Sequence, residues 1–328
     1  MDILIIGGTK FLGRALVDAI LNKGHNLTLF NRGHTSPEIY QNIEQIHGDR
    51  DGEISALGSK KWDVVIDTCG YVPRVVKQSV DFLKDKVKTY VFISTISVYT
   101  ENEEVNKDEN AEIIELEDKN TEDIMASAEN YGGLKFLCEE EVINGFDNSI
   151  IIRPGLIVGP YDPTNRFTYW PVRIRKGGKI LVNNDETYPI QIIDVRDLAN
   201  FTLHLIENQN SGIYNATGLD YQLTISKLFA VCKLFTGTDL EFVKVNDQWL
   251  IDNEVQPWME LPLWIPSESG KALMQVNIEK GIKNGLTFRS LKETVRDTLD
   301  WYDVINGDDL DWPAGLKSER EEELINNI

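Results

Sequence analysis

The stretch ILIIGGTKFLG, residues 3–13, constrains the fold of this chain more than any other segment. A short apolar run that ends in glycines predicts a buried parallel strand that turns directly into a helix. The segment FLGRALVDAILNKG then places apolar side chains at three- and four-residue spacing, which predicts that helix. Together they predict the first strand–turn–helix unit of an α/β fold.

Further strands follow along the chain. The segments NLTLFNRG, IEQIHGD, WDVVIDTCG, KTYVFISTISVY and NSIIIRP each have the pattern of a buried strand, and helical patterns separate several of them. Alternating strands and helices predict right-handed crossovers and a doubly wound parallel sheet. After the sixth strand the pattern becomes irregular, which predicts a smaller lobe. Within that part, YPIQIIDVRDLANFTLHLIE and GIYNATG are expected to return to the sheet.

The first turn matches the glycine pattern of a dinucleotide-binding loop at two of three positions. Gly7 and Gly13 hold the outer places, while Lys10 stands where a glycine would let backbone approach a pyrophosphate. The second strand ends at Asn31 and Arg32, without the acid that would hold the ribose hydroxyls of NAD. Two cations there favour the extra phosphate of NADP, so we expect NADP(H), with NAD(H) as the alternative. An ordinary surface turn is the competing interpretation.

Two further groups of residues could carry chemistry. Tyr131 and Lys135 are four residues apart, which places both on one helical face in line with Cys138 and Val142. A lysine in such an apolar stripe would face the sheet, and burial of its charge there would indicate a functional role. Alternatively, its ammonium could extend along the helix surface to solvent. Ser94 and Thr95 end the fifth strand, where ligands bind in parallel sheets, although such hydroxyls are often capping groups.

In this order, the GGT-x-F-x-G turn, STISVY, the Tyr131–Lys135 pair and RPGLIVGPYDP resemble the extended short-chain dehydrogenase/reductase family, of the NAD(P)-dependent epimerase/dehydratase kind. The segments IIDVRDLA and YNATG fit later parts of the same pattern. The resemblance covers most of the chain. It implies a doubly wound parallel Rossmann sheet with a smaller C-terminal substrate lobe. We expect residues 1–165 and about 190–218 in the Rossmann domain, and about 166–189 and 219–328 in the substrate lobe.

The resemblance assigns Thr95, Tyr131 and Lys135 as the catalytic set. A tyrosine that acts as a base near pH 7 must lower its pKa by about three units, or about 4 kcal/mol. A cation at about 4 Å in an effective dielectric of about 20 supplies a similar amount. We therefore expect Lys135 to lower the pKa of Tyr131 while Thr95 holds the substrate oxygen and hydride passes to or from a nicotinamide.

The expected cofactor-binding residues follow from the same resemblance and from the turn. They are Gly7, Thr9, Lys10, Phe11, Leu12, Gly13, Asn31, Arg32, Asp49, Thr68, Cys69, Ser94, Tyr131, Lys135 and Pro154.

The segment PTNRFTYWPVRIRKGGKILVNN, residues 163–184, has five basic residues and no acid inside an acidic chain. A local positive field suits an anionic ligand such as a nucleotide diphosphate. We expect Arg166, Tyr169 and Arg173 to bind the substrate together with Thr95. Two alternatives are a solvated basic loop and an apolar pocket for an aromatic ketone, as in reductases of the isoflavone type.

The sequence also departs from the family pattern. Besides Lys10, the helix YVPRVVKQSVDFLKDK lacks the usual asparagine–glycine signature, which indicates a divergent branch. Ile96 and Ser97 follow Thr95 in place of the Asp–Glu pair of sugar-nucleotide dehydratases, which argues against dehydration.

Charge and composition limit the kinds of molecule that the protein is expected to bind. The formal net charge of −20 argues against nucleic acid, although a chloroplast RNA-binding branch of the family shares the basic turn. Residues 101–123 carry eleven acids and two lysines, which predicts a solvated and mobile loop. Three scattered cysteines and no leader or membrane span lead us to expect a cytoplasmic protein without a metal site. A homodimer is possible from the resemblance, because members of the family often dimerise through two helices, but CEEEV would place acidic side chains at that interface.

We therefore expect an NAD(P)-dependent oxidoreductase or epimerase that acts on a hydroxyl or carbonyl of a small molecule such as a sugar nucleotide. One alternative is a carbonyl reductase of the isoflavone-reductase type. Another is a non-catalytic NADP(H)-binding sensor or scaffold whose acidic insertion recruits a basic partner.

Overall fold

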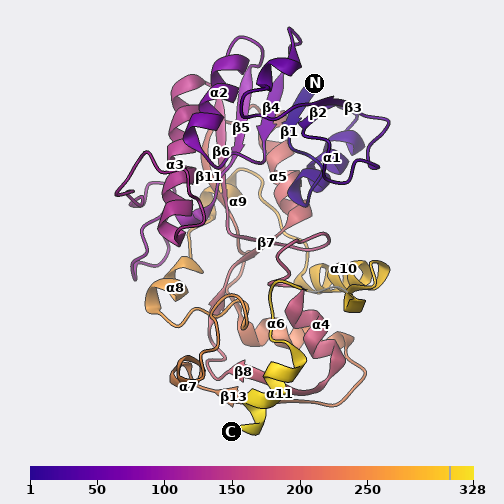
Figure 1. Ribbon diagram of the computed structural model, residues 1–328, viewed down its shortest axis with the longest axis vertical. Helices are drawn as coiled ribbons and strands as arrows, with labels where there is room; N and C mark the ends of the chain where they lie inside the picture. Colours follow the sequence, from indigo (N-terminus) through magenta and orange to yellow (C-terminus); the bar gives the residue numbers. More distant parts are fainter. Residues whose placement is uncertain (310–311) are drawn as a thin grey trace.

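The computed structural model describes residues 1–309 and 312–328 (Figure 1). Its main feature is a seven-stranded sheet in the order β11-β6-β5-β4-β1-β2-β3, and every neighbouring pair is parallel. The strands are β1 (Asp2–Ile6), β2 (Asn26–Asn31), β3 (Glu44–His47), β4 (Val64–Asp67), β5 (Thr89–Ile93), β6 (Ser149–Pro154) and β11 (Gly212–Ala216). The strand order reverses between β1 and β4, as in a doubly wound sheet. The predicted fold class is confirmed.

Helices cover both faces of this sheet because alternate side chains of each strand point to opposite faces. Ile3 and Ile5 of β1 pack in one core with α1 (Leu12–Asn22) and α5 (Val195–Glu207). Leu4 and Ile6 pack in a second core, on the side of α2 (Pro73–Leu83) and α3 (Ala128–Gly145). Both faces are buried, which explains why the strand segments are continuous apolar runs.

The C-terminal part forms a separate layer below the sheet in Figure 1, with its own apolar core around Trp170, Phe229 and Trp264. It holds three two-stranded pairs, β10-β7, β12-β9 and β13-β8. The strands are β7 (Leu156–Val158), β8 (Gly178–Asn183), β9 (Pro189–Ile190), β10 (Ile192–Asp194), β12 (Leu223–Thr224) and β13 (Leu240–Val245). The helices are α4 (Tyr169–Lys176), α6 (Ile225–Cys232), α7 (Asp247–Asp252), α8 (Glu268–Leu273), α10 (Leu291–Val304) and α11 (Ser318–Asn326). Helix α9 (Glu279–Lys283) instead packs against β11 of the large sheet. Short 3₁₀ turns occur in both parts of the chain. Those between strands of the large sheet are η1 (Ile54–Leu57) and η2 (Ile96–Val98), and those in the C-terminal part are η3 (Lys233–Phe235) and η4 (Gly307–Asp309).

The acidic insertion, residues 101–123, is anchored to the core at its centre. The side chain of Lys107 is only 2% exposed and donates to the Thr100 carbonyl at 2.5 Å. A carboxylate oxygen of Glu109 accepts from the backbone N–H of Asn215 at 2.8 Å, and its carbonyl accepts from Arg153 at 3.3 Å. The expectation of a solvated, mobile loop is therefore wrong for this central part. Buried backbone and side-chain partners outweigh its polar composition there.

None of the helices in the described part of the chain is long and apolar enough to span a bilayer. Within the same residues, no group of His, Cys, Asp and Glu side chains is arranged to hold a metal ion.

Candidate active site

A cavity of about 610 Å³ opens at the carboxyl ends of the parallel strands, and we call it the strand-end cavity. All the residues predicted to bind cofactor line it, from the first turn through the ends of β2 and β4 to α3 and Pro154. The predicted catalytic residues Thr95, Tyr131 and Lys135 line it too. The fold therefore brings together in one place side chains that are far apart in the sequence.

The first turn of this cavity is built on close backbone contacts. Gly7 has φ 108°, and a Cβ there would lie 2.4 Å from the Thr68 hydroxyl oxygen. A Cβ on Gly13 would lie 2.6 Å from the Cα of Gly8, so this glycine lets α1 approach the turn. Lys10 is exposed, and the left-handed conformation falls on Gly8 and Phe11 instead. A lysine at the middle position therefore leaves the turn intact.

The ribose end of the strand-end cavity carries exposed positive charge. The Arg32 side chain is 67% exposed and its guanidinium lies 4.0 Å from a carboxylate oxygen of Asp49. The side chain of Asn31 accepts from the backbone N–H of Gly33 at 2.8 Å, which fixes the end of β2. Lys10 and Arg32 line the same cavity, and Lys10 forms no ion pair with an acid in the described part of the chain. This end can accept an additional phosphate.

Tyr131 meets Thr95 because α3 packs closely on the turn after β5. A Cβ on Gly132 would lie 1.9 Å from the Ser97 carbonyl oxygen, so only glycine permits this approach. Burial raises the pKa of Tyr131, and polar interaction with the side chain of Thr95 lowers it in part. Thr95 also caps η2 by accepting from the backbone N–H of Ser97 at 3.1 Å.

Lys135 is 3% exposed, as its place in the apolar stripe predicts. Its ammonium donates to the carbonyl oxygens of Gly70 and Ile93, both at 2.7 Å. Burial lowers the pKa of Lys135, and Lys135 is not among the groups that shift the pKa of Tyr131. The expectation that Lys135 lowers the pKa of Tyr131 is therefore wrong for this structure. The two carbonyls hold the ammonium, and burial of the phenol dominates.

Sequence analysis missed two groups at this site. Arg50 lines the strand-end cavity and forms a bidentate ion pair with the buried Asp67, with both N–O distances 2.7 Å. Tyr90 donates to the same carboxylate at 2.8 Å. Tyr71 also lines the cavity, beside Lys135. The sequence does contain an indication of this pair, because Asp67 ends an apolar strand and a buried carboxylate requires a hydrogen-bonding or cationic partner. The identity of that partner depends on tertiary contacts.

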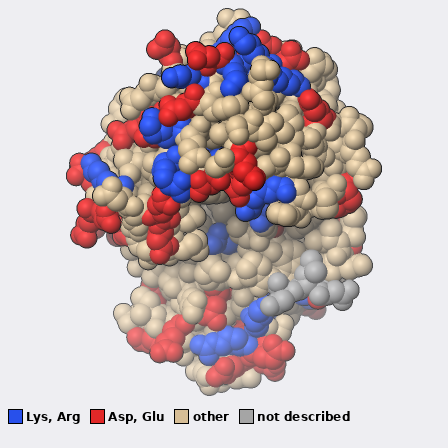
Figure 2. All heavy atoms as spheres, turned by 45° about the horizontal axis from the view of Figure 1, so that its top comes forward, with Lys and Arg blue, Asp and Glu red and all other residues tan. Residues whose placement is uncertain are grey.

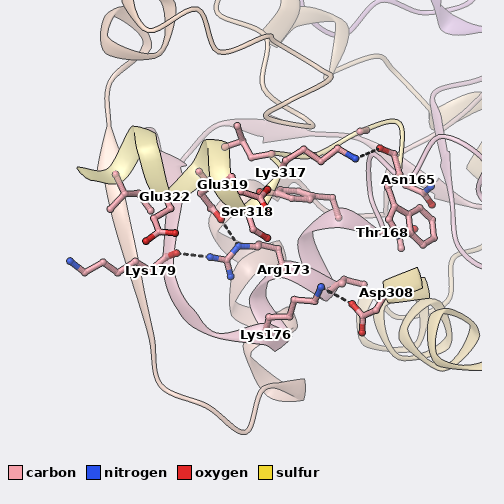
Figure 3. Close-up of a pocket in the computed structure, with 18 of the residues that line it drawn as sticks. Asn165, Thr168, Arg173, Lys176, Lys179, Asp308, Lys317, Ser318, Glu319 and Glu322 are labelled. Carbon is pink, nitrogen blue, oxygen red and sulfur yellow. Dashed lines mark hydrogen bonds and ion pairs between the residues drawn. The ribbon is translucent and has the colours of Figure 1, made fainter. Parts of the chain in front are cut away.

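The predicted substrate residues separate in space. Arg166, Tyr169 and Arg173 are all absent from the described lining of the strand-end cavity. Tyr169 and Arg173 line a second cavity of about 690 Å³, which we call the lobe cavity (Figure 3), and Arg166 lines neither cavity. It lies between α4, η4 and α11. Arg166 is half-buried, and burial lowers its pKa while the nearby carboxyl of Asp162 raises it. Its guanidinium contacts the sulfur of Met259 at 3.5 Å.

Acids from the C-terminal part compensate most of the basic segment. Arg173 pairs with the buried carboxylate of Glu321 at 2.7 Å, Arg175 with Asp303 at 2.7 Å, and Lys176 with Asp308 at 2.6 Å. Figure 3 shows Lys176 turned to Asp308, and Arg173 turned to the backbone carbonyl of Lys179, rather than extended into open space. The expected free positive field is therefore wrong for these three side chains, because sequence-distant acids neutralise them.

The fold and the strand-end cavity define a dinucleotide-binding protein of the short-chain dehydrogenase/reductase type. The chain belongs to the NAD dependent epimerase/dehydratase family, whose pattern it matches over residues 3–217. This match confirms the predicted resemblance.

One curated relative is the chloroplast stem-loop binding protein of 41 kDa b from Arabidopsis thaliana. It is 28% identical over 250 residues, which are 70% of this chain and 62% of the relative. The chain thus spans less than two thirds of the length of the relative it matches.

Solved structures resemble the whole architecture. The UDP-glucuronic acid 4-epimerase from Bacillus cereus, in complex with NAD, has a TM-score of 0.67 at 18% identity, over 93% of this chain and 99% of that one. The UDP-glucose 4-epimerase from Thermotoga maritima, with UDP-glucose, has a TM-score of 0.65 at 19% identity, over 93% of this chain and 100% of that one. At these identities the likeness shows a shared fold.

Proposed function

We propose that this protein is an NADP(H)-preferring epimerase or oxidoreductase that acts on a hydroxyl or carbonyl of a sugar nucleotide. The observation that carries the proposal is that Thr95, Tyr131 and the buried Lys135, which are distant in sequence, all line the strand-end cavity. These groups stand at the carboxyl ends of the strands, where doubly wound proteins bind ligands.

The lining of the cavity fits a dinucleotide. Gly7 and Gly13 let the first turn pack closely on Thr68 and on the start of α1, where backbone N–H groups can bind a pyrophosphate. Lys10 and Arg32 would hold a phosphate on the adenosine ribose, which supports the preference for NADP(H) over NAD(H). When bound, the nicotinamide supplies the acceptor or donor of hydride.

The side chains around the reacting carbon would handle the proton. Thr95 would orient the substrate oxygen, and Tyr131 would give a proton to that oxygen or take one from it. Because burial raises the pKa of Tyr131, the phenol of the ligand-free protein is protonated at neutral pH and is ready to act as an acid. Its action as a base requires positive charge to approach when ligands bind.

The anionic part of the substrate would bind Arg166. This guanidinium is half-buried, and the described residues give it no ion pair, unlike Arg173 and Arg175. A desolvated guanidinium without a paired carboxylate favours a phosphate ligand. The two solved epimerases named above are UDP-sugar 4-epimerases, one in complex with NAD and the other with UDP-glucose, which supports the same substrate class. Tyr169 and Arg173 lie at the lobe cavity, so the proposal does not use them for substrate binding.

The direct test is turnover of UDP-sugars. Purified protein is incubated with UDP-glucose or UDP-glucuronic acid and NADP+ or NAD+, and the C4 epimer is measured by NMR. We expect epimer or cofactor reduction in wild type, and a KM about tenfold or more higher in Arg166→Met with kcat kept. Bound cofactor without turnover of any tested sugar nucleotide would overturn the substrate class. It would favour the carbonyl-reductase alternative or the non-catalytic sensor.

We also propose that the protein does not bind nucleic acid, although one relative is named for stem-loop binding. On the face seen in Figure 2, Lys and Arg side chains are interspersed with Asp and Glu, and the net charge is −20. Binding of a stem-loop RNA that weakens steeply with salt would contradict this. The cytoplasmic location and a homodimer through α2 and α3 stay predictions.

A further inference from the structure

The ammonium of Lys135 sits in an enclosure made of neutral groups. Two walls are the carbonyl oxygens of Gly70 and Ile93, each 2.7 Å from the nitrogen. The other two are aromatic faces, with the ring centroid of Phe92 at 4.2 Å and that of Tyr71 at 5.2 Å. Both distances lie within the range of a cation–π interaction. Nothing in this enclosure carries a negative charge.

The nearest acids are already engaged. Asp67, at the end of β4, is paired with Arg50 at 2.7 Å, and Glu139 on α3 is paired with Arg153 at 2.6 Å. The described residues therefore provide no carboxylate in ion-pair contact with Lys135. Its charged form depends on carbonyl dipoles and ring faces, because burial acts against it.

Of the two rings, only Tyr71 belongs to the cavity lining. Phe92 is fully buried inside β5, whereas Tyr71 is 41% exposed and lines the strand-end cavity together with Tyr131. Burial and the neighbouring Tyr131 raise the pKa of Tyr71 to about 12, so its hydroxyl stays protonated throughout the working pH range. The ring face of Tyr71, rather than an ionised oxygen, is what reaches Lys135.

We infer that Tyr71 is a positioning residue of the active site: its ring face closes the enclosure around the Lys135 ammonium and keeps that lysine charged beside the catalytic tyrosine. The consequence for turnover rests on the proposed function, but the ring–ammonium contact does not. The groups that act on Lys135 besides these are Cys138 and Glu139 on α3, Asp67 on β4 and Arg50 after β3.

The first test uses the ligand-free protein and a double-mutant cycle. Tyr71→Phe keeps the ring, Tyr71→Leu removes it, and each is combined with Lys135→Met. Urea unfolding is measured at pH 6 and pH 9. At pH 6 we expect Tyr71→Leu to favour unfolding about fivefold more than Tyr71→Phe when Lys135 is present, and equally when it is methionine.

The sign of the pH dependence follows from the charge. The ring favours the ammonium form, so its loss lowers the pKa of Lys135 further. The penalty is present at low pH, where the amine of the folded protein is protonated, and shrinks as the pH rises through the lowered pKa of Lys135. Tyr71→Trp, which offers a stronger ring face, should shift unfolding the other way at pH 6. This variant keeps the inference testable if Tyr71→Leu does not fold. A coupling of zero with both variants overturns it.

The second test is the pH profile of kcat with whichever substrate is turned over. One limb of the kcat–pH curve should follow the deprotonation of Lys135. Tyr71→Leu, which removes the ring, should move this limb to lower pH by about half a unit, whereas Tyr71→Phe should leave it in place. A purely structural role would lower kcat without moving that limb. The positioning role would be overturned if the double-mutant cycle showed coupling between Tyr71 and Lys135 in the ligand-free protein but the kcat–pH curves of Tyr71→Leu and Tyr71→Phe had the same Lys135 limb. Coupling without any cofactor binding in wild type would instead overturn the proposed function alone.

Discussion

The strand-end cavity and the lobe cavity are similar in volume, about 610 and 690 Å³. Each contains a paired arginine, Arg50 with Asp67 in the first and Arg173 with Glu321 in the second, but their lysines differ. At the lobe cavity, Arg173 and Lys176 are each paired with an acid. At the strand-end cavity, Lys135 is held only by neutral groups, and Lys10 is exposed without an acidic partner in the described residues. Paired charges hold parts of the chain together, whereas unpaired charges in a cavity are available to a ligand.

The largest contrast is expected between two tyrosines. Tyr131→Phe should lower turnover about 10²- to 10⁴-fold, because the proton that moves to or from the substrate oxygen is lost. Tyr169→Phe at the lobe cavity is the matched control and should leave turnover within about twofold. Both are measured by steady-state kinetics, with NADPH affinity measured in parallel. Near wild-type turnover in Tyr131→Phe would rule out the proposed mechanism.

A second contrast concerns arginines. Arg173→Met should cost about 3 kcal/mol in the free energy of unfolding, because it leaves the carboxylate of Glu321 buried without its partner. The same variant should keep its substrate affinity. Arg166→Met should do the reverse, with a raised KM and little change in urea unfolding. If Arg173→Met changed KM and spared stability, the lobe cavity would have to be reconsidered as the substrate site.

A third contrast uses glycines. Gly132→Ala should destabilise the protein by about 1–3 kcal/mol and reduce turnover, because the new methyl group meets the Ser97 carbonyl oxygen and pushes Tyr131 away from Thr95. Gly237→Ala is the control, since a Cβ there meets no atom within 4 Å. Thermal unfolding and kinetics on both variants decide the matter. Equal behaviour would mean that the close approach of α3 does not position the tyrosine.

The smallest contrast is between lysines. Lys10→Met should weaken NADPH binding about tenfold, because one of two cations at the ribose end is removed. Lys176→Met removes only an exposed ion pair with Asp308, so it should change stability by less than about 1 kcal/mol and leave NADPH binding alone. Fluorescence titration and urea unfolding measure the two effects. Equal NADPH affinity in Lys10→Met and wild type would remove Lys10 from the cofactor site.

Local pattern was enough to predict much of the fold and part of the candidate site. Apolar runs and glycines that are close in sequence predicted β1, the first turn and α1, and helical spacing predicted that Lys135 is buried. Contacts between distant segments were not predictable in this way. The carbonyls of Gly70 and Ile93 are 65 and 42 residues from Lys135.

The two charged segments also show that contacts between distant parts of the chain were not predictable from local sequence. Composition alone predicted a free basic field at residues 163–184 and a mobile acidic loop at residues 101–123. The partners that decide both outcomes come from far along the chain, such as Glu321, 148 residues from Arg173, and Asn215, 106 residues from Glu109. Net charge within a segment does not specify where its side chains find counter-ions.

The central claim is that the strand-end cavity binds a nicotinamide dinucleotide through its ribose-end cations. It is tested most directly by titrating purified wild type and Arg32→Asp with NADPH and NADH in parallel, followed by nucleotide fluorescence. We predict saturable NADPH binding in wild type, tighter than NADH by about tenfold, and a shift toward NADH in Arg32→Asp. Absence of binding by both nucleotides, or affinities unchanged by Arg32→Asp, would contradict it.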